Sequence, residues 1–169
     1  MDNAWAALMH AWQQPLLTTA MSGVTWLGSL FVLLPLALAL AWRQRSDWRQ
    51  RLFPPLAVLG AAGLAQALKW LVDRDRPDLF PALVNMPADA SFPSAHTMQI
   101  TAFVAAWLLW RERALQAGPL ALGVLLVGMV AVSRTYLQVH FLSDVLAGIL
   151  AGALWAVLLD RLLARKRRL

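Results

Sequence analysis

Apolar residues form five long runs along this chain, and short polar segments separate them. The runs cover residues 24–42, 53–72, 94–110, 119–133 and 141–163. The first run has no charged residue, and its 19 residues would reach about 28 Å as an α-helix, close to the hydrocarbon thickness of a bilayer. The third and fourth runs are shorter, so flanking polar residues are expected to extend them. The pattern predicts five transmembrane helices.

A more polar pattern precedes these runs. Between Ala4 and Met21, large apolar side chains recur at helical spacing with polar residues between them. This predicts an amphipathic helix lying in the membrane interface. The stretch lacks a basic start before an apolar core, so no cleavable signal peptide is expected. The predicted fold is an all-α, polytopic helical bundle, with a single domain over residues 1–169.

Composition supports burial in lipid. Hydrophobic residues make up 60% of the chain and charged residues 14%, which leaves too little polar surface for a soluble domain of this length. The chain has no Cys, so disulfides, thiol nucleophiles and thiolate metal sites are excluded. A pI near 11.3 is common in nucleic-acid-binding proteins. Here, however, the basic residues lie between apolar runs, so we expect no nucleic-acid partner.

The placement of basic residues predicts an orientation. They gather between the first two runs, between the third and fourth, and after the last, at Arg43, Arg45, Arg49, Arg51, Arg111, Arg113, Arg161, Arg165, Lys166, Arg167 and Arg168. With five spans these segments share one side, which the positive-inside rule makes cytoplasmic. The N-terminus is then outside and the C-terminus inside. The outer side receives only Lys69, Arg74, Arg76 and Arg134.

Three polar motifs lie at the outer ends of the predicted spans. They are Lys69-x6-Arg76-Pro77, Pro93-Ser94-Ala95-His96 and Ser133-Arg134-x5-His140-x3-Asp144. Positions about 70 residues apart should therefore meet on one membrane face. The loop over residues 78–92 joins two motifs and contains several apolar residues. It is either a cover that admits a lipid or a plain loop with a partly buried apolar side.

The spacing of His140 and Asp144 suggests a catalytic pair. Residues four apart share a helix face, so the carboxylate can hold one ring nitrogen while the other attacks. A structural hydrogen-bonded pair at a helix start explains the same spacing. His96 in the second motif is either a general acid or a satisfied polar residue.

The cations Lys69, Arg76 and Arg134 need partners, because a cation near the bilayer costs roughly 2.5–3.5 kcal/mol at a helix centre. A doubly charged phosphate fits an Arg fork well. Two alternatives remain: the cations, Lys69 above all, snorkel to lipid headgroups, or they form internal ion pairs, with carboxylates available at Asp73, Asp75 and Asp78. Ser94 has the signature of a helix N-cap, and a helix N-terminus also offers backbone N–H groups to an anion.

In this order, the three motifs resemble the signature of the type 2 phosphatidic acid phosphatase superfamily. The resemblance implies that His140 is a nucleophile forming a phosphohistidine, with Asp144 orienting it and His96 as general acid. It implies phosphate binding without a metal or cofactor, through Lys69, Arg76, Ser94, the backbone N–H of Ala95, and Arg134. Ala95 stands where the family pattern has Gly. We expect this residue in a helical first turn, where Ala is allowed and its N–H survives.

The resemblance further implies a bacterial enzyme of the cytoplasmic membrane whose site faces the exterior. The short layout is most similar to undecaprenyl diphosphate phosphatases. Phosphatidylglycerol phosphate, phosphatidic acid or a lipid A phosphate are alternative substrates. A non-catalytic lipid-phosphate-binding or transport protein is the alternative of another class. We expect no obligate protein partner.

Overall fold

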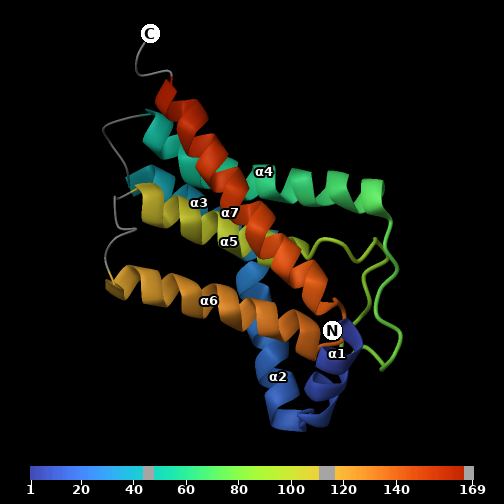
Figure 1. The fold of residues 1–169 in the computed structure, drawn as a ribbon. Coiled ribbons are helices and arrows are strands. Elements are labelled where there is room, and N and C mark those ends of the chain that lie inside the picture. Colours follow the sequence, from blue (N-terminus) through green and yellow to red (C-terminus); the bar gives the residue numbers. More distant parts are fainter. Residues whose placement is uncertain (44–47, 111–116, 166–169) are drawn as a thin grey trace.

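The computed structural model describes residues 1–43, 48–110 and 117–165 (Figure 1). Every regular element in these ranges is helical, which confirms the predicted all-α fold. The elements are α1 (Asp2–Ala11), α2 (Pro15–Val24), the 3-10 helix η1 (Thr25–Gly28), α3 (Leu30–Arg43), α4 (Trp48–Val72), α5 (Ala95–Trp110), α6 (Ala117–Tyr136) and α7 (Leu142–Arg165).

The predicted interfacial helix over residues 4–21 is divided into α1 and α2. A proline ring clashes with the carbonyl of the preceding helical turn, so Pro15 favours a break after α1. It instead occupies the first turn of α2, after Gln14 in extended conformation. The apolar periodicity on both sides of this break concealed it in the sequence.

The predicted span over residues 24–42 is bent and begins earlier than expected. The segment Pro15–Gly28 and helix α3 meet at an angle of 47°. Together they are long and apolar enough to form one broken membrane span. Ser29 makes the bend with extended backbone, and its Oγ accepts the N–H of Val32 at 3.3 Å as a helix cap does. Gly28 permits close packing here, because a Cβ at this position would lie 2.9 Å from the carbonyl oxygen of His96.

Three described helices are long and apolar enough to cross a membrane: α4, α6 and α7 up to Ala164. The bent pair is a fourth candidate. The predicted third span is the shorter apolar helix Ala95–Leu109, so five spans are reached only by counting α5. Helix α5 packs against α3, α4, α6 and α7, and much of its surface is buried. Many leucines on the other helices are exposed, including Leu125 and Leu150, as lipid-facing side chains would be.

Small residues bring α7 onto α5. A Cβ at Gly152 would lie 2.4 Å from the carbonyl oxygen of Met98, and one at Gly148 would lie 2.8 Å from that of Ser94. Close backbone approach through small residues is a common way to pack membrane helices. This contact sets the start of α5 directly beside the first turns of α7.

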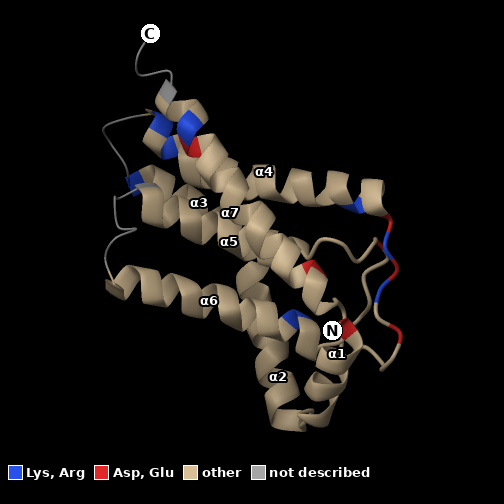
Figure 2. Cartoon of the chain, in the orientation of Figure 1, with Lys and Arg blue, Asp and Glu red and all other residues tan. Residues whose placement is uncertain are grey.

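Basic residues lie at both ends of the bundle (Figure 2). Arg43, Arg49, Arg51 and Arg161 lie at one end, near the end of α3, the start of α4 and the end of α7. Lys69 and Arg134 lie at the other, near the ends of α4 and α6. Arg45, Arg111, Arg113 and residues 166–168, which also carried the predicted orientation, are outside the described residues.

Candidate active site

Four helix ends bring the three motifs together. Lys69 lies in the last turn of α4 and Arg134 in the last turn of α6. His96 lies in the first turn of α5, and Asp144 in the first turn of α7. Because these helices alternate in direction, residues distant in sequence share one end of the bundle.

His140 lies two residues before α7, not within the helix as the spacing suggested. Its Nδ1 faces Asp144 Oδ2 at 3.5 Å, longer than an ordinary hydrogen bond. Both side chains are almost fully buried. Nδ1 has no other hydrogen-bond partner in the described chain. The pair leaves the second ring nitrogen, Nε2, away from the carboxylate.

Asp144 is held firmly although it lies at the end of the bundle. One carboxylate oxygen, Oδ2, accepts the hydroxyl of Ser91 and the backbone N–H of Phe141 at 2.9 Å. The other, Oδ1, accepts Nη1 of Arg74 at 2.7 Å. A carboxylate fixed by three donors presents a defined direction to His140.

Arg74 is the main residue that the motif analysis missed. Besides Asp144, its guanidinium bonds Ser143 Oγ at 2.7 Å and Asp2 Oδ2 at 3.0 Å. It also lies over the Phe141 ring, 4.0 Å from the ring centroid. Arg74 therefore ties α1, α7 and the segment after α4 together. Its position on the sparsely basic side, predicted to be the outer one, was the one available sequence signal.

Lys69 and Arg76 share one carboxylate, that of Asp89. Lys69 Nζ lies 3.3 Å from Oδ2, and Arg76 Nη2 lies 2.7 Å from Oδ1. Backbone carbonyls complete the arrangement: Lys69 also bonds Ala90, and Arg76 bonds Asp89 at 2.9 Å and Val139 at 2.7 Å. Internal pairing was an open alternative, and it occurs with Asp89 rather than with Asp73, Asp75 or Asp78.

Arg134 is the third cation and is 5% exposed. Its Nη1 donates to Thr25 Oγ1 at 2.7 Å, while Nε has no partner among the described residues. A buried guanidinium with free donors is suited to an anionic ligand. Arg134 interacts electrostatically with His96, and so do His140, Lys69 and Arg76. The two imidazoles and three cations therefore form one cluster.

Ser94 and Ala95 form the start of α5. Ser94 is fully buried, its Oγ accepts Thr97 Oγ1 at 3.0 Å, and its N–H donates to the Asp144 carbonyl at 3.1 Å. Ala95 is the first helical residue. Asp73 and Gln138 are the non-glycine residues with positive φ in the described ranges, so Ala95 is unstrained. The expected helical first turn at Ala95 is confirmed.

Burial lowers the pKa of His140 to about 4, although the Asp144 carboxylate opposes the shift. Arg134 and Arg76 add to the lowering, because their positive charges disfavour a second cation. The imidazole is therefore neutral near pH 7, the form that has a free electron pair.

The loop over residues 78–92 is partly packed. Leu83 and Val84 lie against a buried cluster that contains Met9 and Tyr136, and the Leu83 N–H donates to the Leu137 carbonyl at 3.1 Å. Two other apolar side chains of the loop, Leu79 and Met86, are exposed. The loop thus packs on this apolar cluster with one side and exposes apolar side chains on the other.

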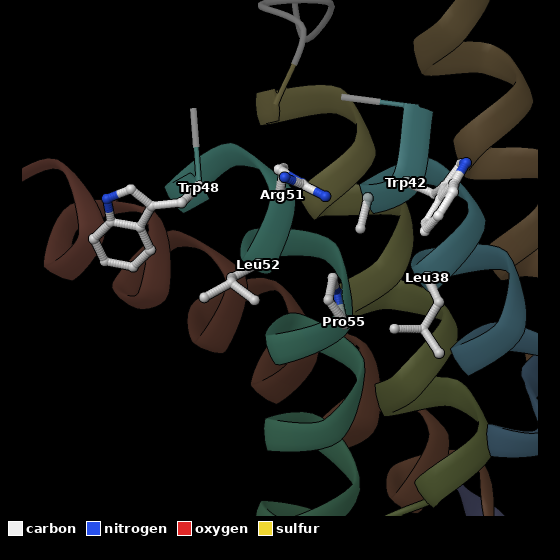
Figure 3. Close-up of a pocket in the computed structure, with 7 residues that line it drawn as sticks. Leu38, Trp42, Trp48, Arg51, Leu52 and Pro55 are labelled. Atoms are coloured by element: carbon white, nitrogen blue, oxygen red, sulfur yellow. The ribbon is translucent and has the colours of Figure 1, made fainter. Parts of the chain in front are cut away.

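A separate groove of about 420 Å³ lies at the opposite end of the bundle, between α3 and α4 (Figure 3). Its lining is mostly apolar and includes Trp42, Trp48 and Arg51. No motif residue lines it. Groups of three or more His, Asp or Glu that could hold a metal ion are also absent from the described part of the chain.

This fold and cluster define an integral membrane protein with a group of buried cations beside a His–carboxylate pair. The chain belongs to the PAP2 superfamily, whose sequence model matches residues 51–168. The predicted family is therefore confirmed, and the chain is a multi-pass membrane protein of a phosphatase family.

Three similar proteins carry phosphatase names. A decaprenylphosphoryl-5-phosphoribose phosphatase of Mycobacterium tuberculosis is 40% identical over 149 residues, covering 83% of this chain and 77% of that protein. A putative undecaprenyl-diphosphatase of Escherichia coli is 32% identical over 128 residues, covering 73% of this chain and 63% of that protein. The crystal structure of a PAP2-type phosphatidylglycerolphosphate phosphatase from Bacillus subtilis superposes with a TM-score of 0.82 at 29% identity. The superposition covers 95% of this chain and 83% of that protein.

Proposed function

We propose that this protein removes the terminal phosphate of a membrane lipid through a phosphohistidine intermediate. The observation that carries the proposal is that Arg134 and Arg76 interact electrostatically with the neutral His140 imidazole, and that Lys69 joins them around His96. Preorganised positive charge stabilises the negative charge spread over the oxygens of a transferring phosphoryl group. Nδ1 of His140 faces Asp144, so Nε2 is the attacking nitrogen.

In the first step, Nε2 of His140 forms a bond to phosphorus while the bond to the leaving oxygen breaks. His96 donates a proton to that oxygen. The negative charge of a bound phosphate favours the protonated form of His96 that this step requires. In the second step, water attacks the phosphohistidine, His96 accepts the proton, and inorganic phosphate leaves. No metal takes part, because Lys69, Arg76 and Arg134 supply the positive charge.

We propose a polyprenyl lipid as substrate, with undecaprenyl diphosphate as the first candidate. Two of the three similar proteins are named for polyprenyl lipids. A polyprenyl-linked sugar phosphate is the second candidate, because it corresponds to the relative with 40% identity. Phosphatidylglycerol phosphate, phosphatidic acid and a lipid A phosphate complete the comparison.

The test is phosphate release by purified protein in detergent from each of these lipids, with His140→Ala as the blank. His10→Ala is a matched control, because His10 stacks on Phe80 outside the cluster. We expect His10→Ala to retain activity and His140→Ala to lose it on every lipid. Undiminished release by His140→Ala would contradict the mechanism, whereas absence of release by the parent protein from every lipid would favour a non-catalytic lipid-binding or transport protein. Activity retained in a chelating buffer is expected for metal-independent chemistry.

We also propose that the site faces the exterior of a bacterial cytoplasmic membrane. The basic group at the opposite end of the bundle supports this orientation through the positive-inside rule. The native chain has no Cys, so single cysteines can be placed at Asn85 and Arg43, which are both exposed. An impermeant reagent added to intact cells should label Asn85→Cys and spare Arg43→Cys. The reverse pattern would place the site in the cytoplasm.

A further inference from the structure

Asp89 bridges two of the three cations of the cluster. Each carboxylate oxygen contacts a different cation: Oδ1 contacts Arg76 at 2.7 Å and Oδ2 contacts Lys69 at 3.3 Å. Two oxygens of a phosphate group can bridge a lysine and an arginine in the same way. Asp89 is 40% exposed, whereas Lys69 is 3% and Arg76 9% exposed. The partly exposed Asp89 carboxylate thus contacts two cations that are nearly buried.

Lys69 and Arg76 have few free donors while the Asp89 carboxylate is bound to them. The Arg76 guanidinium has five N–H groups, and it makes four hydrogen bonds to Val139, Ala90 and Asp89. Lys69 has three N–H groups and contacts Ala90 and Asp89. Each cation therefore has about one free donor. The bonds to backbone carbonyls orient the two side chains, so the donors on the Asp89 carboxylate are those a phosphate can take.

The charge of Asp89 persists at neutral pH. Partial burial by itself would raise the pKa of its carboxyl group, but the Arg76 hydrogen bond and the Lys69 and Arg76 charges outweigh burial and hold the pKa below its usual value. Two nearly buried cations need a counter-ion when no substrate is bound. Asp89 supplies that charge from a loop, where movement requires no change in helix packing.

We infer that the Asp89 carboxylate occupies the phosphate positions on Lys69 and Arg76, leaves when a phosphate group binds, and returns as inorganic phosphate departs. This inference rests on the proposed function, because it takes these cations as phosphate ligands. It makes Asp89 a residue that weakens phosphate binding and limits inhibition by the product.

The test is the affinity for inorganic phosphate, measured by calorimetric titration of the His140→Ala protein in detergent. Adding Asp89→Asn should tighten phosphate binding about tenfold, since binding no longer breaks a charge-assisted pair. Asp78→Asn removes the same charge from the same loop, and no ion pair of Asp78 is found in the described chain. This control should change the affinity less than about twofold. Asp89→Glu keeps the competing charge and should bind phosphate weakly, like the parent.

The inference would be overturned if Asp89→Asn bound phosphate equally or more weakly while thermal unfolding showed that the variant was folded. That result would mean that Asp89 holds Lys69 and Arg76 in their binding geometry. In the His140-containing protein, Asp89→Asn should lower the inhibition constant for phosphate in parallel. Absence of phosphate binding in every variant would overturn the proposed function together with the inference. Normal lipid hydrolysis with unchanged affinity in Asp89→Asn would overturn the inference alone.

Discussion

Replacing Arg74 tests whether the orientation of Asp144 governs the chemistry. Arg74 contacts Asp144 and not the phosphate cations, so its removal should change the nucleophile's support and leave phosphate binding largely intact. Asp144 is fully buried, and losing one partner of a buried ion pair costs about 3–5 kcal/mol. Two features reduce this value. Arg74 is 31% exposed beside a cavity of about 470 Å³, and Asp144 keeps the Ser91 and Phe141 donors.

We therefore expect Arg74→Ala to destabilise the native position of the Asp144 carboxylate by about 1–3 kcal/mol, the cost of one unsatisfied buried acceptor. If the loss is expressed in the transition state, kcat falls about 5- to 150-fold. KM should change by less than about threefold, because ground-state binding of phosphate is retained. Arg74→Lys should recover only part of kcat, since one ammonium group cannot reach Asp144, Ser143 and Asp2 together.

The assay is steady-state phosphate release in detergent on the best lipid of the panel. Arg161→Ala is the control, because Arg161 is exposed near the end of α7 at the far end of the bundle. Nitrogen-15 NMR of the histidine ring supplies a second measurement: the proton on Nδ1 of His140 should become less fixed in Arg74→Ala. A large rise in KM with unchanged kcat would refute the reasoning and make Arg74 a phosphate ligand.

Three further predictions concern stability, measured by thermal unfolding in detergent. Burial lowers the pKa of His140 from 6.5 to about 4. Between these pH values the unfolded chain binds a proton that the folded protein does not, so stability should fall as the pH falls from 6.5 to about 4. A His140→Gln protein with the same pH slope would contradict this. A Cβ at Gly152 would lie 2.4 Å from the Met98 carbonyl oxygen, whereas Gly63 faces open space. Gly152→Ala should therefore lower the midpoint, and Gly63→Ala should raise it, because Ala in place of a helical Gly stabilises by up to about 1 kcal/mol. Asp73 has a φ of 44° after α4, so Asp73→Gly should stabilise by up to about 1 kcal/mol, and a lower midpoint would show that its side chain is needed.

The gathering of the motifs could be predicted because it depends only on helix direction. Apolar runs of sufficient length fix the spans, and basic residues fix which ends lie together. Lys69 and Arg134 then fall at one end whatever the details of packing. The breaks near the N-terminus were missed, although Pro15 and Ser29 are ordinary signals for a helix start. Apolar periodicity continued across both positions and outweighed these single residues.

The partners of Lys69, Arg76 and Asp144 could not be predicted, because non-helical segments present them. The segment after α4 folds back so that the Ser91 N–H donates to the Arg74 carbonyl at 2.8 Å. This contact sets Asp89 against the cations and Ser91 against Asp144. Helical periodicity carries no information about such a turn. Charge balance does carry some, since buried cations require counter-ions, but Asp73, Asp75 and Asp78 met that requirement equally well in sequence.

The two carboxylates of the cluster have different roles because their surroundings differ. Asp144 is fully buried, is anchored by donors from three segments, and belongs to a helix. Asp89 is 40% exposed and belongs to a loop, although it too bridges two charged groups. A carboxylate that orients a nucleophile must keep its position, and one that competes with phosphate must be able to leave. Substituting Asp144 should therefore abolish turnover, whereas substituting Asp89 should alter phosphate affinity and leave the first chemical step in place.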